Sequence, residues 1–225
     1  MKQTDLELLA LKNEIDEMWK LVLSQMDKTK TAYINHDVEL AHEIISREKR
    51  VNAFDSKIDS DCENYIALYA PVAIDLRLVL SLIKISNTLE RIGDFAEGIA
   101  RQVLEENHPK LDSKLAEELQ VGLIFDIVNT MLMECYIALE SENTKLAGKI
   151  LATDNKVDQL YHGAMPILAK YINLHPELAV FGLKTMLVIR KLERVGDHCS
   201  NIIEEIVFYI DAKVLKHTQP PIAHK

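Results

Sequence analysis

Hydrophobic side chains recur at alternating spacings of four and three residues along two long stretches of the chain. The first stretch contains Leu78, Leu82, Ile85, Leu89, Ile92, Ala96, Ile99 and Val103. The second contains Phe181, Thr185, Val188, Leu192, Val195, Cys199, Ile202 and Ile206. This heptad spacing is typical of α-helices that pack nearly antiparallel in a bundle. A shift of 103 residues superposes Leu80 on Leu183 and Ile99 on Ile202, so the pattern predicts a duplicated helical protein.

Breaks in the pattern divide the chain into six long predicted helices, three in each half. We expect them near residues 4–34, 37–69, 71–107, 113–140, 143–173 and 176–215, with Asp37 as an N-cap. The fifth is expected to kink around Gly163 and Pro166. The predicted fold class is all-α, with two homologous antiparallel three-helix bundles at residues 1–110 and 111–217. Residues 218–225 are expected to form a mobile tail.

Composition supports this fold class and narrows the functions. Only 7 Gly and 6 Pro interrupt a chain of 225 residues that is 48% hydrophobic, which favours few turns and long helices. A net charge of −9 without a basic cluster argues against nucleic-acid binding. The 3 widely spaced cysteines fit a reducing compartment. Without a signal sequence or 18 uncharged apolar residues in a row, we expect a cytoplasmic protein.

Acidic pairs are repeated along with the hydrophobic pattern. The segment Leu-Glu-Arg-Ile-Gly-Asp at residues 89–94 returns as Leu-Glu-Arg-Val-Gly-Asp at residues 192–197. Each copy places Glu and Asp four residues apart, on one face of a helix. A shift of 106 residues aligns a second set on the preceding helices, in which Asp55 and Asp59 continue the first stripe. That set consists of Glu48 with Asn52 and Asp154 with Asp158.

The two sets of pairs are predicted to lie at the same height in each half. In an antiparallel hairpin, residues equally far from the turn lie side by side. The pair at 48 and 52 and the pair at 90 and 94 are equally distant from Pro71. In the second half, the corresponding pairs are equally distant from the turn at His175 and Pro176. Each half should therefore bring carboxylates from two neighbouring helices together.

Carboxylates gathered in this way repel each other unless a cation lies between them. Ligand sets made only of oxygen suit magnesium, manganese or iron and make zinc less favourable. An isolated pair of this kind is most often a solvated helix face, but the duplication and the matched height favour one or more metal ions at each site. The predicted ligands are Glu48, Asn52, Glu90, Asp94, Asp154, Asp158, Glu193 and Asp197.

Four residues near the acidic pairs have roles that the pattern alone does not define. Gly93 and Gly196 either permit a close approach of a neighbouring element or reflect ordinary small-residue packing, which we favour. His198 is expected to be exposed rather than a ligand. Asn201, one turn beyond Asp197, is a candidate for supporting the second site.

The repeated Glu-Arg-(Ile/Val)-Gly-Asp segments, each on the third helix of its half, resemble the PhoU family of phosphate-uptake regulators. Asp75-Leu76-Arg77 after the first hairpin proline is also similar. The likeness extends over residues 4–212. It departs at Asn52, an amide where the other pairs are acidic, and this leaves the first site with three carboxylates against four. Glu177-Leu178-Ala179 replaces the Asp-Leu-Arg element in the second half.

The resemblance implies a cytoplasmic regulator and not an enzyme. It implies metal clusters at the acidic pairs and negative regulation of phosphate uptake and of the phosphate-starvation response. The implied partners are a phosphate ABC transporter and a sensor histidine kinase, with contact to the membrane only through them, and a second copy of the chain in a homodimer.

Two other functions remain open from the sequence. One is a metal-free helical scaffold whose acidic stripes only solubilise it. The other is a metalloenzyme with carboxylate-bridged metals, which the lack of a nucleophile, a general base or a Gly-rich phosphate loop disfavours.

Overall fold

The fold was analysed in a computed structural model that describes residues 3–105 and 109–215. The helices are α1 (Gln3–Asn35), α2 (Val38–Tyr69), α3 (Ala73–Val103), α4 (Ser113–Glu118), α5 (Val121–Glu140), α6 (Ala147–Leu174) and α7 (Ala179–Asp211), with a 3₁₀ turn η1 (Pro176–Leu178) before α7. The described residues contain no β-strand, so the all-α prediction is confirmed.

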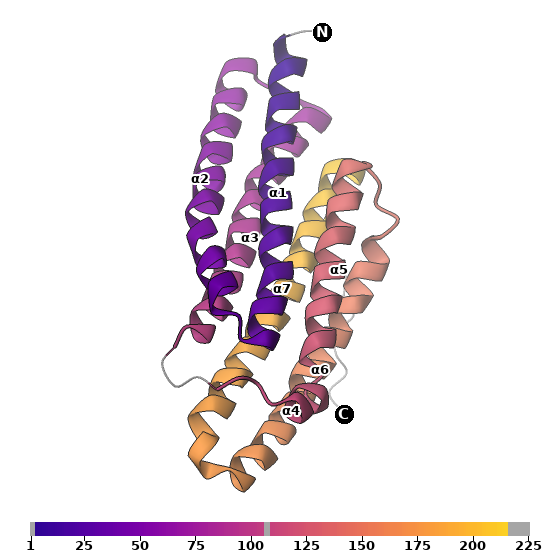
Figure 1. The fold of residues 1–225 in the computed structure, drawn as a ribbon. Helices are drawn as coiled ribbons and strands as arrows, with labels where there is room; N and C mark the ends of the chain where they lie inside the picture. Colours follow the sequence, from indigo (N-terminus) through magenta and orange to yellow (C-terminus); the bar gives the residue numbers. More distant parts are fainter. Residues whose placement is uncertain (1–2, 106–108, 216–225) are drawn as a thin grey trace.

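The helices form two bundles of three long helices, as the repeat predicts. Helices α1, α2 and α3 pack together in the first half, and α5, α6 and α7 in the second. Figure 1 shows the two bundles side by side, with the α2–α3 and α6–α7 hairpins at opposite ends of the molecule. Helices α3 and α7 therefore run antiparallel where the halves meet. The prediction of two homologous three-helix bundles is confirmed.

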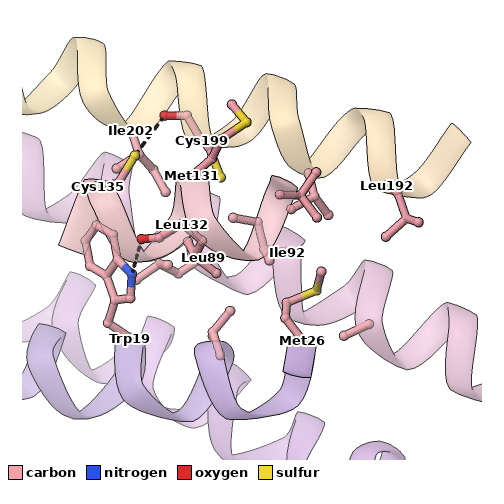
Figure 2. Close-up of a cluster of buried hydrophobic side chains, with 14 of the residues drawn as sticks. Trp19, Met26, Leu89, Ile92, Met131, Leu132, Cys135, Leu192, Cys199 and Ile202 are labelled. Atoms are coloured by element: carbon pink, nitrogen blue, oxygen red, sulfur yellow. Dashed lines mark hydrogen bonds between the residues drawn. The ribbon is translucent and has the colours of Figure 1, made fainter. Parts of the chain in front are cut away.

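Both heptad seams form the core. All eight predicted positions on α3 are at most 2% exposed, and those on α7 at most 6%. The hydrophobic core also joins the two halves, and within it Trp19 of α1 donates its indole N–H to the carbonyl of Leu132 on α5 (Figure 2). The Cys135 thiol donates to the Cys199 carbonyl at 3.3 Å. Cys199 is thus the core residue that its seam position indicates.

The contact between α3 and α7 uses a second apolar face of each helix. Val79 and Ile189 are fully buried there. Ser81 donates its hydroxyl to the carbonyl of Glu205, and Arg77 donates to the carbonyl of Tyr209. These residues seal the two halves together, while Leu183 on the same helix stays 62% exposed.

The fourth predicted helix is wrong in one respect, because it is divided into α4 and α5. Gln120 adopts the left-handed region (φ 52°) and separates them. The break contains no Pro, and its Gly122 lies inside α5, so no local signal marks it. The turn lets Leu115 and Leu119 point into the core, where they are 3% and 2% exposed. Tertiary burial therefore decides this boundary.

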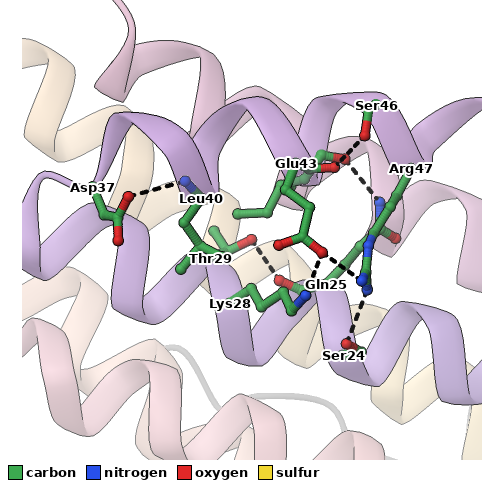
Figure 3. Close-up of polar contacts among 10 residues, drawn as sticks. Ser24, Gln25, Lys28, Thr29, Asp37, Leu40, Glu43, Ser46 and Arg47 are labelled. Atoms are coloured by element: carbon green, nitrogen blue, oxygen red, sulfur yellow. Dashed lines mark hydrogen bonds and ion pairs between the residues drawn. The ribbon is translucent and has the colours of Figure 1, made fainter.

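Other helix ends agree with the sequence to within a few residues. Asp37 caps α2 by accepting a hydrogen bond from the Leu40 N–H at 2.9 Å (Figure 3). Helix α6 continues through Pro166. Helix α3 ends at Val103 and α7 at Asp211, each earlier than expected. The expected tail at 218–225 lies outside the described residues.

Within the described ranges, α5 alone is long and apolar enough to cross a membrane by length and composition. The sequence analysis did not identify this helix, because Asp126 and Glu134 interrupt the run of 18 uncharged apolar residues that it required. In the fold, α5 packs against α1, α6 and α7, with Ile124, Phe125 and Val128 fully buried, as in the core helix of a bundle.

Candidate metal centre

The first acidic site is organised around Glu48 of α2. Glu48 is only 5% exposed and lies directly opposite Gly93 of α3. A Cβ atom at Gly93 would come within 3.1 Å of Glu48 Oε2 and 3.2 Å of Val51 Cγ1. The glycine therefore gives this carboxylate its room between the two helices.

Glu48 has few polar partners for so buried a group. Gln25 of α1 donates its Nε2 to Glu48 Oε2 at 3.4 Å. Glu48 Oε1 is inaccessible to solvent and has no hydrogen-bond partner among residues 3–105 and 109–215. Burial, followed by the charges of Asp94, Glu97 and Glu90, raises the pKa of Glu48 to about 7, against the opposing Gln25 hydrogen bond. Without a cation, this site favours the protonated acid.

The rest of the first acidic site lies nearer the surface. Glu90 is half-buried and Asp94 exposed. Burial raises the pKa of Glu90, and the charges of Asp94 and Asp55 raise it further. Asp55 also carries a buried oxygen, Oδ1, without a partner in the described chain. Asn52 is solvent-exposed. Asp55 and not Asn52 therefore adds to the negative charge that α2 places near Glu90.

The second acidic site repeats this arrangement around Asp154 of α6. A Cβ atom at Gly196 would come within 2.7 Å of Asp154 Oδ1. Ser200 of α7 donates its hydroxyl to Asp154 Oδ2 at 2.7 Å, while Oδ1 is buried and lacks a partner in the part of the chain that is described. Burial raises the pKa of Asp154 to about 6, opposed by the Ser200 bond and assisted by the Asp197 and Asp158 charges.

Two further acids of the second acidic site, Glu193 and Asp197, also have a raised pKa. Burial raises the pKa of Glu193, and the charges of Asp197 and Asp158 add to it. Burial raises the pKa of Asp197 too, although Arg194 opposes the shift. These four carboxylates, Asp154, Asp158, Glu193 and Asp197, share one electrostatic environment, as the matched heights predict.

The glycines of the repeated motif have a definite role in this geometry. Gly93 faces Glu48 and Gly196 faces Asp154, so each copy of the motif offers space to one acid from the neighbouring helix. Both glycines thus permit the close approach of an acid, the alternative that the sequence left open, and Gly93 also packs closely against Val51 as small-residue packing predicts. The contacts of Gly93 with Glu48 and of Gly196 with Asp154 agree with the predicted hairpin register, in which the acidic pairs of two neighbouring helices lie at the same height.

Three polar residues next to the acids differ from the sequence-based expectation. Gln25, which the sequence did not single out, is fully buried on α1. Ser200 binds Asp154, whereas Asn201 is exposed. His198 is half-buried against Phe95, with ring centroids 5.5 Å apart, and not exposed. A glutamine at an otherwise apolar position of the helical pattern is the sequence signal that could have identified Gln25.

The donors fit a hard cation in chemistry but are not drawn together as a ligand set. Glu48 Oε1 and Asp154 Oδ1 are buried oxygens without partners among the described residues. Neighbouring carboxylates raise the pKa of Glu48 and of Asp154, and a bound cation would reverse that effect. Within the two described ranges, no three His, Cys, Asp or Glu side chains are grouped closely enough to hold an ion as they stand. Binding would require rotation of the other carboxylates toward Glu48 in the first site and toward Asp154 in the second.

Fold and site together define a duplicated helical-bundle protein with one acidic hairpin in each half. The PhoU domain family matches residues 15–103 and 121–206, one segment in each half. The chain belongs to the PhoU family, whose members are regulatory accessory proteins and not enzymes. The expectation that it is not an enzyme is thereby confirmed.

Individual relatives match nearly the whole chain. It is 32% identical over 215 residues to the phosphate-specific transport system accessory protein PhoU of Edwardsiella tarda, covering 96% of this chain and 87% of that protein. The Escherichia coli protein of the same name is also 32% identical, with 96% and 88% covered. The crystal structure of PhoU from Pseudomonas aeruginosa has a TM-score of 0.85 at 29% identity and covers 94% of this chain and 100% of that one.

Proposed function

We propose that this protein is a metal-binding negative regulator of phosphate uptake and of phosphate-starvation signalling. Membership of the PhoU family supports the phosphate-transport part, because the relatives are named as accessory proteins of the phosphate-specific transport system. The observation that carries the metal part is the repeated contact of an acid, which has one buried and unbonded oxygen, with a motif glycine.

A metal ion would act here by neutralising carboxylates whose burial and mutual repulsion are otherwise unfavourable. In the first acidic site, Glu48, Glu90 and Asp94 would hold the ion with Asp55, and Asn52 could join only by turning inward. In the second, Asp154, Asp158, Glu193 and Asp197 would hold it. Oxygen donors favour magnesium, manganese or iron over zinc. Binding would join α2 to α3 and α6 to α7, so the surfaces of these hairpins would depend on metal.

The regulator would act through contacts and not through turnover. We place it in the cytoplasm, where its partners would be a phosphate ABC transporter and a sensor histidine kinase, with the membrane reached only through them. A second copy of the chain is a further expected partner, giving a homodimer. We do not expect nucleic acid as a partner, because the chain carries a net charge of −9.

The genetic experiment for this proposal is deletion of the gene, followed by measurement of phosphate uptake in phosphate-replete medium. We expect uptake and starvation-response transcription to rise, and the intact gene to restore both. Unchanged uptake together with an unchanged starvation response would remove the regulatory role.

The metal part is tested separately by complementation with variants. Glu193→Ala with Asp197→Ala should fail to restore repression, because the second acidic site loses two donors. The matched control is Glu117→Ala with Glu118→Ala, which removes two acids from α4, outside both acidic sites. Full repression by the Glu193/Asp197 variant would favour the metal-free scaffold instead.

A further inference from the structure

Gln25 is a fully buried amide on α1, and its side chain reaches the groove between α2 and α3. Its Nε2 donates to Glu48 Oε2 and to the carbonyl of Ile44, both at 3.4 Å. Its Oε1 would lie 3.6 Å from a Cβ atom at Gly93. The amide therefore enters the first acidic site from the side opposite to solvent.

Two oxygens at this inner end lack partners within the described chain, Gln25 Oε1 and Glu48 Oε1. A buried acceptor left without a donor is unfavourable, and a bound ion is one of the explanations for such an atom in a native protein. Amide and carboxylate oxygens are both suitable ligands for a hard cation. An ion drawn to Glu48 would therefore meet a second oxygen at the same depth.

The position of Gln25 is fixed by its own helix and by its neighbours. Its carbonyl accepts the Thr29 hydroxyl at 2.7 Å. One turn away, Glu43 of α2 accepts from Lys28 and Arg47, each at 2.5 Å, and Arg47 also donates to Ser24 at 3.1 Å (Figure 3). This network holds α1 in register with α2 beside the amide.

Among the described residues, no side chain of α5, the first long helix of the second half, hydrogen-bonds Asp154 as Gln25 of α1 does Glu48. Asp154 receives its hydrogen bond from Ser200, which is on α7 itself. Ser200 occupies the repeat position of Glu97, a shift of 103 residues, and Glu97 instead adds negative charge near Glu48. The first acidic site is thus built from three helices and the second from two.

The geometry points to Gln25 as a positioning residue of the first acidic site, which holds Glu48 in place for a hard cation and ties α1 to the metal-dependent hairpin. This inference rests on the proposed metal function. It makes the two sites inequivalent, with Gln25 serving only the first and Ser200 only the second.

The test measures manganese binding to each site alone. Glu193→Ala with Asp197→Ala leaves only the first acidic site, and Glu90→Ala with Asp94→Ala leaves only the second. In each background, free Mn²⁺ is titrated and quantified by its electron paramagnetic resonance signal. Gln25→Met keeps the length of the side chain without its amide, and Gln25→Leu is a second variant in case the first perturbs packing. Thr29→Val is the matched control, because the Thr29 hydroxyl donates to the Gln25 backbone carbonyl and not to an acid of the site.

We expect Gln25→Met to weaken Mn²⁺ binding at the first acidic site by about tenfold or more, the usual effect of losing a residue that orients a ligand. Binding at the second site should not change, and Ser200→Ala should show the reverse. Gln25→Met also removes the hydrogen bonds to Glu48 and to the Ile44 carbonyl, so the metal-free protein should lose some stability. Unchanged Mn²⁺ affinity at the second site separates positioning from a general loss of structure. If the unsubstituted chain binds Mn²⁺ but Gln25→Met leaves the first site unchanged, this inference alone is overturned. If the unsubstituted chain binds none, the metal proposal fails with it.

Discussion

Phe95 and His198 occupy the same position in the two copies of the repeat, 103 residues apart, and their rings lie against each other with centroids 5.5 Å apart. Equivalent positions meet in this way only where an approximate twofold axis passes between the copies. The antiparallel contact of α3 with α7 supplies that axis, and it relates the first acidic site to the second. The halves are thus arranged as a twofold pair within one chain.

His198→Phe is expected to stabilise the protein. His198 Nε2 is buried and has no partner among the described residues, so a second phenylalanine would remove an unsatisfied polar atom. We expect a gain in the free energy of unfolding on the order of 1 kcal/mol at neutral pH. Urea unfolding of the two proteins measures it, and a loss of stability would contradict this account of the interface.

The same substitution should have a larger effect in acid. Burial, with the charges of Arg194 and Arg91, lowers the pKa of His198 to about 4. The unfolded chain, with the usual pKa near 6.5, binds this proton more readily, so the folded protein loses stability as pH falls from about 6.5 to 4. The advantage of His198→Phe should therefore grow over this range. An advantage independent of pH would exclude the histidine as its source.

Glu48 should give the opposite pH dependence in metal-free protein. Its folded pKa of about 7 lies above the ordinary value of 4.5, so its contribution to stability is fully present below about pH 4.5 and is lost as pH rises through 7. Glu48→Gln removes the charge, and we expect it to be more stable than the unsubstituted protein at pH 8 by roughly 1–2 kcal/mol. Unfolding in chelator between pH 5 and 8 tests this; equal slopes for the two proteins would contradict it.

Alanine at the motif glycines tests the fit of the buried acids. Gly196→Ala would place its Cβ 2.7 Å from Asp154 Oδ1, so the carboxylate must move. Gly163→Ala on α6 meets nothing within 4 Å and is the matched control. We expect the control to gain about 0.5–1 kcal/mol from helix propensity and Gly196→Ala to lose that gain and bind metal more weakly. Equal stabilisation by both, measured by urea unfolding, would show that the space is not needed.

The single tryptophan reports whether the two halves unfold together. Trp19 of α1 is fully buried, donates to Leu132 of α5 and packs on Tyr136 with ring centroids 5.9 Å apart. Its fluorescence therefore follows the contact between the halves, while circular dichroism follows all helices. We expect the two signals to give one coincident urea transition, because one continuous core joins the bundles. Separate midpoints would mean that the halves are independent units.

The sequence was sufficient for what depends on periodicity and duplication. The heptad seams place Leu89 and Leu192 in the core, and the distances from the hairpin turns set Glu48 beside the motif of α3. The sequence was insufficient for features that depend on how separate helices pack against each other. The break at Gln120 accompanies the burial of Leu119 in the core. Gln25 enters the site from a helix whose alignment with α2 and α3 no short motif encodes.

The central claim is that each hairpin binds metal through its carboxylates, and elemental analysis of the purified protein after loading with manganese, magnesium or iron tests it most directly. We expect more than one equivalent of metal per chain. The amount should fall when Glu193 and Asp197 become alanine, and fall again when Glu90 and Asp94 are also replaced. A chain that retains no metal under any of these loading conditions would contradict the account.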